Sequence, residues 1–155
     1  ILDVPNFKIV IAGEGEDKDK ISSFIQKNEL EKHIFLIGYV PNIFPYIFSS
    51  KGFILTSLWE DPGFVLIEAA SCRVPVFSSN CPDGPKAIIK DNFNGLLFES
   101  NDENDLIKNF RKFNKIINNN ETKKKLVLNN LILARQFSLF NHYLKLNEIL
   151  SNGCN

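Results

Sequence analysis

The sequence lacks methionine altogether. Because translation starts at a methionine codon, we expect these 155 residues to be a piece of a longer protein. At roughly 100–200 residues per domain, the length predicts one domain, or one domain and a fraction of another. A chain of this size can bury a substantial apolar core.

Other shortages disfavour several classes of protein. The 18 basic and 18 acidic residues cancel, whereas a general nucleic-acid binder needs a basic face to displace counterions. No apolar run reaches the roughly 20 residues that cross a bilayer, and no stretch has the pattern of a secretory signal peptide. The three cysteines, Cys72, Cys81 and Cys154, lack the paired spacing of a disulfide framework or a zinc site. We therefore expect reduced thiols and no metal site.

What the sequence does contain is a regular alternation of short apolar runs and segments with helical periodicity. The predicted strands are residues 7–12, 34–37, 53–56, 74–78 and 95–98. The predicted helices are residues 17–28, 41–49, 63–72, 85–90, 102–118, 121–134 and 139–150. This alternation predicts an α/β fold, with a parallel sheet covered by helices on both faces and a helical C-terminal region.

Two details of burial follow from the same pattern. The strands are continuously apolar, which predicts that they are buried on both faces, the first strand included. In the last helix, the helical spacing predicts that Tyr143, Leu144, Leu146 and Ile149 turn inward.

The richest candidate for chemistry is the segment from Thr56 to Gly63, which leaves a strand and opens directly into a helix. Ligands of open α/β sheets bind beyond the carboxyl ends of the strands. A helix N-terminus there offers free N–H groups and a partial positive charge, which together hold phosphate. Gly63 allows a close approach to the backbone, and Phe64 and Val65 place their N–H groups in the first turn.

Two acids, Glu60 and Glu68, flank this helix start. Glu68 stands between Ile67 and Ala69 in the most apolar helix, where an unpaired charge is expensive. A carboxylate repels phosphate but accepts hydrogen bonds from a sugar diol, so the segment has the outline of a site for a sugar–diphosphate–nucleoside. The alternative is that the helix dipole simply favours acids near its start, which accommodates Glu60 and Asp61 but not Glu68.

The run Glu60-Asp61-Pro62-Gly63-Phe64-Val65-Leu66-Ile67-Glu68-Ala69 resembles the E-x7-E signature of the retaining family 4 glycosyltransferases. Residues 11–16, 35–40, 74–82 and 95–98 resemble further segments of that family, in the same order. The resemblance implies one half of a GT-B fold, with a Rossmann-like parallel sheet. Residues 1–155 would form the donor-binding domain, truncated at its N-terminus and without the acceptor-binding domain.

The resemblance also implies a role for each matching residue. Glu60 would be the catalytic residue and hold hydroxyls of the donor sugar, and Glu68 would hold the ribose diol. Asp61, Pro62 and Gly63 would line the sugar, while the N–H groups of Phe64 and Val65 would hold the diphosphate. Gly38, Tyr39 and Val40 would line the pocket for the base. Gly13 and Gly15 would keep the neighbouring loop thin enough to admit the donor.

The implied activity is retaining transfer of a glycosyl group from a UDP- or GDP-linked sugar, in the synthesis of a cell-surface glycan or glycolipid. No cofactor, metal or nucleic acid is expected. The acceptor, a sugar or a lipid-linked sugar, would bind the absent domain. We expect a cytoplasmic location, and a peripheral position at the inner face of the membrane stays open for the full-length protein.

The sequence departs from the family in three places. The Arg and Lys that neutralise the diphosphate in the family precede the first strand of this chain. Ala87 stands where an acid is usual, and Leu139-Phe140 replaces a usual Trp-Glu. Two other functions stay open. One is a stand-alone nucleotide-sugar binding module that acts with a separate acceptor-binding subunit, and the other is a nucleotide-sugar epimerase of similar fold.

Overall fold

The computed structural model describes residues 7–152, without the side chain of Asn152. The chain divides into two compact units, Ile1–Ile43 and Phe44–Asn155. Cys72 and Cys81 are free thiols, and Cys154 lies outside the described residues.

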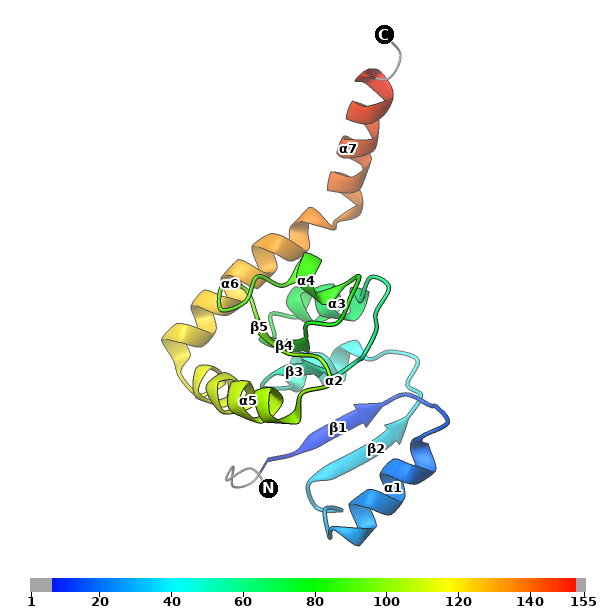
Figure 1. The fold of residues 1–155 in the computed structure, drawn as a ribbon. Helices are drawn as coiled ribbons and strands as arrows, with labels where there is room; N and C mark the ends of the chain where they lie inside the picture. Colours follow the sequence, from blue (N-terminus) through cyan, green and yellow to red (C-terminus); the bar gives the residue numbers. More distant parts are fainter. Residues whose placement is uncertain (1–6, 153–155) are drawn as a thin grey trace. The chain divides into compact units, whose positions relative to one another are not determined.

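The first unit is a β-α-β unit (Figure 1). Its elements are β1 (Ile9–Ala12), α1 (Lys18–Lys27) and β2 (Ile34–Gly38). The two strands pair in parallel, with Ile9 opposite Ile34. The prediction of a buried first strand is wrong, because Ile9, Val10 and Ile11 are 36–49% exposed. A strand is buried on both faces only where layers cover both of them, and one helix in this unit supplies a single layer.

The second unit has a three-stranded sheet in the order β3-β4-β5. Its elements are α2 (Phe44–Ser49), β3 (Phe53–Leu55), α3 (Phe64–Ser71), β4 (Val76–Ser79), α4 (Pro85–Ile88), β5 (Leu96–Phe98), α5 (Glu103–Ile117), α6 (Asn120–Gln136) and α7 (Leu139–Asn152). All three strands are parallel. The predicted α/β class with parallel strands and flanking helices is therefore confirmed, but the strands form two sheets and not the single sheet predicted.

The core of the second unit forms where α5 packs against β4 and β5 (Figure 1). The central strand β4 is buried along its whole length. Phe77 from β4 stacks on Phe113 from α5, with ring centroids 5.3 Å apart. The buried members of this core are Phe77, Leu96, Phe98, Phe113 and Leu126. The core thus holds the sheet rigidly enough to present loops from its carboxyl edge.

Helix boundaries follow local rules in the second unit. The Asp102 carboxylate accepts a hydrogen bond from the Asp105 N–H at 3.0 Å, which makes Asp102 the cap of α5. Helix α2 begins at Phe44, three residues later than predicted, with Pro45 in its first turn. Proline is tolerated there because the first N–H groups of a helix have no partner within it.

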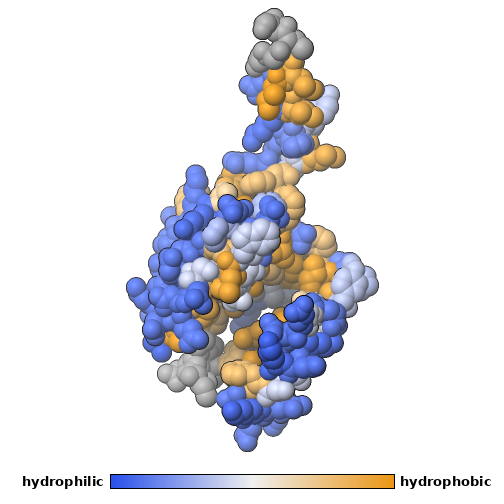
Figure 2. Space-filling model, turned by 45° about the vertical axis from the view of Figure 1, so that its right-hand side comes forward, coloured by the Kyte–Doolittle hydropathy of each residue, from blue (hydrophilic) through white to orange (hydrophobic). Residues whose placement is uncertain are grey.

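The inward turn predicted for the last helix is wrong. Tyr143, Leu144, Leu146 and Ile149 are 46–68% exposed. Helix α7 contacts α6, the helix that precedes it. Its apolar side chains stay exposed and are visible as orange atoms in Figure 2. Periodicity identifies the apolar face of a helix, but burial also needs a second element to cover that face. In the described part of the chain, no helix is both long and apolar enough to cross a membrane.

Candidate functional site

The segment that joins β3 to α3 ends in a glycine with a special backbone conformation. Gly63 caps α3 with φ 77° and ψ 46°, in the left-handed region that side chains rarely adopt. The carbonyl of Gly63 accepts a hydrogen bond from Leu66 N–H at 3.0 Å. Within residues 7–152, the N–H groups of Phe64 and Val65 have no acceptor. The start of α3 therefore offers two free donors, as a phosphate-binding helix start would.

The Glu60 side chain lies beside this helix start. Its Oε2 atom is 3.5 Å from the position that a methyl group on Gly63 would occupy. The carboxylate is half-buried and accepts no hydrogen bond from the described residues. Its lone pairs are thus available to hydroxyl groups, while its position at the positive end of α3 also suits the helix dipole.

Glu68 lies one turn further into α3. Its side chain is half-buried, and no described residue donates a hydrogen bond to its carboxylate. The carboxylate is therefore unpaired among the described residues, and its partial exposure to solvent lowers the cost of its charge. Burial raises the pKa of the Cys72 thiol, and the negative charge of Glu68 raises it further.

The predicted residues of the first unit gather only in part. Gly13, Gly15 and Gly38 line a hollow of about 190 Å³, whereas Tyr39 and Val40 do not. Gly38 has φ 68°, and a methyl group on it would lie 2.7 Å from Glu14 Oε1. The positive φ favours glycine there, whereas the Glu14 carboxylate is the end of a flexible side chain that could move aside.

Sequence reasoning missed an ion pair in this hollow. Glu14 accepts a hydrogen bond from Lys18 Nζ at 2.9 Å and another from Tyr39 N–H at 3.3 Å. The Lys18 ammonium, and then the Tyr39 N–H, lower the pKa of the Glu14 carboxyl. The signal was present as an acid four residues before a base, the spacing that brings two side chains together on a helical turn.

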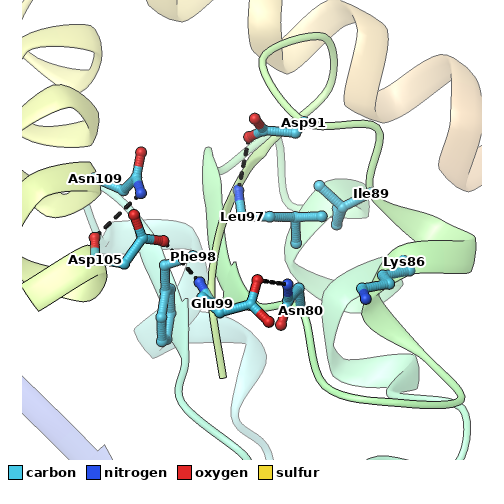
Figure 3. A pocket seen from close by; sticks show the side chains of 9 residues that line it. All are labelled: Asn80, Lys86, Ile89, Asp91, Leu97, Phe98, Glu99, Asp105 and Asn109. Atoms are coloured by element: carbon cyan, nitrogen blue, oxygen red, sulfur yellow. Dashed lines mark hydrogen bonds between the residues drawn. The ribbon is translucent and has the colours of Figure 1, made fainter. Parts of the chain in front are cut away.

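A larger hollow in the second unit was also missed (Figure 3). It measures about 400 Å³ and lies at the carboxyl ends of β4 and β5. Its lining residues are Asn80, Lys86, Ile89, Asp91, Leu97, Phe98, Glu99, Asp105 and Asn109. Most of the polar side chains bind one another or the backbone, as the dashed lines in Figure 3 show. Among residues 7–152, no three His, Cys, Asp or Glu side chains are placed to hold a metal ion.

Residues 1–130 match the family model described as "Glycosyl transferases group 1". The chain is 37% identical over 99 residues to poly(ribitol-phosphate) alpha-N-acetylglucosaminyltransferase of Staphylococcus aureus, which is 64% of this chain and 20% of that protein. It is 34% identical over 103 residues to the Escherichia coli UDP-Gal:alpha-D-GlcNAc-diphosphoundecaprenol alpha-1,3-galactosyltransferase, covering 64% of this chain and 26% of that protein.

Two solved structures resemble the fold. A mutant of S. aureus TarM, in complex with Fondaparinux, alpha-GlcNAc-glycerol and UDP, has a TM-score of 0.79 at 30% identity, over 89% of this chain and 27% of that one. Anabaena Alr3699/HepE in complex with UDP has a TM-score of 0.80 at 20% identity, over 96% of this chain and 42% of that one. The chain therefore spans 20–42% of the length of these four proteins.

Proposed function

We propose that this chain, which belongs to the glycosyl transferases group 1 family, forms the donor-binding domain of a retaining GT-B glycosyltransferase. In this proposal, the enzyme has the E-x7-E signature of family 4. The start of α3 carries the proposal. There the two free N–H groups of Phe64 and Val65 stand in sequence between the acids Glu60 and Glu68. Donors for a diphosphate thus lie between acceptors for hydroxyls, which is the order of groups in a nucleotide sugar.

Each residue of the second unit then has a distinct task. The α3 N–H groups bind the diphosphate, since its charge is favoured at the positive end of a helix. Glu68 accepts hydrogen bonds from the ribose diol, and Glu60 accepts them from the donor sugar. The backbone of Asp61, Pro62 and Gly63 lines that sugar. For the first unit, the proposed role of Gly13, Gly15, Gly38, Tyr39 and Val40 is contact with the base.

The names of similar proteins suggest the wider reaction. One names transfer of N-acetylglucosamine to poly(ribitol-phosphate), and another names transfer of galactose to a GlcNAc-diphosphoundecaprenol. Two solved neighbours are complexes with UDP. We propose that this chain likewise serves cell-surface glycan synthesis, takes a UDP- or GDP-linked sugar, and uses no metal. In this proposal, other parts of a longer protein bind the acceptor.

Titration of the 155-residue chain with UDP and GDP tests the proposal directly. We expect a dissociation constant on the order of 0.1–1 mM for one of them, equivalent to about 4–5.5 kcal/mol. The amide signals of Gly63 to Glu68 should shift in the same titration, and added magnesium should change the affinity little. If millimolar nucleotide leaves these amides unperturbed, the start of α3 is not a nucleotide site.

A further inference from the structure

The segment that carries Glu60 is contacted from outside at both of its ends, by a hydrogen bond at one end and by close packing against a glycine at the other. At the first end, the Ser79 hydroxyl donates a hydrogen bond to the Ser57 carbonyl at 2.6 Å. Ser79 is the last residue of β4 and is only 1% exposed. At the other end, Gly84 lies so close that a methyl group on it would be 2.6 Å from the Pro62 carbonyl oxygen and 3.1 Å from Glu60 Cβ.

The carboxyl end of β4, from which the Ser79 contact starts, is itself anchored, and Gly84 follows it five residues later, directly before α4. Asn80 N–H donates to the Phe98 carbonyl at 2.8 Å. The Asn80 side chain donates to Glu99 Oε2 at 2.5 Å and accepts from Ser100 N–H at 2.9 Å. Glu99 N–H in turn donates to Asp105 Oδ2 at 2.8 Å, which ties β5 to the start of α5 (Figure 3). The strand end is therefore a fixed support.

The Glu60 side chain has no such anchor of its own, since no described residue donates a hydrogen bond to its carboxylate. Its direction depends on the backbone of residues 57–63. From these contacts we infer that Ser79 and Gly84 are positioning residues, which hold this segment so that the Glu60 carboxylate stays at the start of α3. The inference rests on the proposed function, in which Glu60 contacts the donor sugar while the α3 N–H groups contact the diphosphate.

The inference makes a specific claim about which part of the ligand is affected. Loosening residues 57–63 should weaken contacts to the sugar and leave contacts to the nucleotide almost unchanged, because the latter come from α3. A group held within a few tenths of an ångström binds better than one that must be ordered on binding. The quantity to measure is therefore the preference of the chain for a UDP-sugar over UDP.

The sequence supplies a probe for the segment itself. Trp59 is the single tryptophan of the chain and is 64% exposed, so its fluorescence reports on residues 57–63 without labelling. Ser79→Ala removes the hydrogen bond to Ser57, and the methyl group of Gly84→Ala would displace Pro62. In both variants we expect lower Trp59 anisotropy and about a twofold increase in acrylamide quenching. Ser79→Thr keeps a hydroxyl and should restore the original values. Ser71→Ala is the matched control, because its hydroxyl binds the Ile67 carbonyl within α3.

The binding arm uses UDP, UDP-glucose and UDP-N-acetylglucosamine. For the sugar that the unchanged chain prefers over UDP, Ser79→Ala should reduce that preference about fivefold and leave UDP affinity within twofold. Unchanged Trp59 mobility in both alanine variants would overturn the inference, as would an equal loss of affinity for UDP and the UDP-sugar. If the unchanged chain binds no nucleotide, the proposed function fails, and Trp59 mobility alone decides whether Ser79 and Gly84 hold the segment. Gly84→Ala provides a second test if Ser79→Ala does not fold.

Discussion

Glu60 and Glu68 have different surroundings. Glu60 lies in the loop before α3, beside Gly63, whereas Glu68 projects from α3 one turn beyond the free N–H groups. Both carboxylates are half-buried and without hydrogen-bond donors among the described residues. Neither is therefore explained by a structural contact, and ligand binding can tell them apart.

We expect Glu68→Gln to weaken UDP binding by roughly 1.5–3 kcal/mol, because a charged acceptor of the ribose diol becomes a neutral amide. Glu60→Gln should leave UDP affinity nearly unchanged and lower the affinity for a UDP-sugar. Calorimetric titration of both variants measures these effects.

Thermal unfolding of the same two variants is the control. If Glu68 were only a tolerated acid, Glu68→Gln would change the melting temperature and leave UDP affinity as it was. Equal losses of UDP affinity in the two variants would mean that the roles of Glu60 and Glu68 are assigned wrongly.

Part of this site could be predicted from the sequence, and the reasons are local. A glycine between a strand and an apolar run predicts a helix start, and Gly63 caps α3 as that pattern requires. The burial of Glu68 could not be predicted, because it depends on which helices pack beside α3. The contacts of Ser79 and Gly84 with residues 57–63 could not be predicted either, because these two residues are distant in sequence from Ser57 and Pro62.

At the scale of elements, periodicity located every strand and helix of residues 7–152 but did not predict what covers them. The parallel pairing of β3, β4 and β5 follows from helices between successive strands, which leave no room for hairpins. The exposure of β1 and of α7 depends on neighbours that an apolar pattern does not specify. An apolar face shows where another element can pack, but whether an element covers that face depends on how the elements assemble.

Two phenylalanines in the helical region test this difference. Phe113 on α5 is 1% exposed and stacks on Phe77, whereas Phe140 on α7 is 68% exposed. Phe113→Ala should lower the free energy of unfolding by about 3–5 kcal/mol, through lost burial and the cavity left behind. Phe140→Ala should change it by less than about 0.5 kcal/mol, as surface substitutions usually do.

Chemical denaturation of both variants provides the measurement, with circular dichroism as the signal. A large loss in Phe140→Ala would mean that α7 is covered in solution. A small loss in Phe113→Ala would mean that the core between α5 and the sheet is not closely packed.

At the scale of the whole molecule, the family and fold are established, and the proposed activity depends on how much of the enzyme this chain contains. The chain covers 20% of one curated relative and 42% of one solved neighbour. The fold class could be predicted because the alternation of strands and helices is a property of the entire chain. The division into two units could not, since no shift in composition or linker-like stretch marks the boundary between Ile43 and Phe44.

The proposed division of labour predicts that the 155-residue chain binds a nucleotide but transfers no sugar. Stabilisation of the charge that develops on the leaving diphosphate is usually the largest catalytic contribution. In the proposed site, only the two N–H groups at the start of α3 would serve this purpose, and the flanking Glu60 and Glu68 are acids. With UDP-glucose or UDP-N-acetylglucosamine and a polyprenyl-linked sugar, a radiolabel assay should detect no product. Turnover at about 1 per second, an ordinary enzymatic rate, would show that this chain contains both the acceptor site and the groups that neutralise the diphosphate.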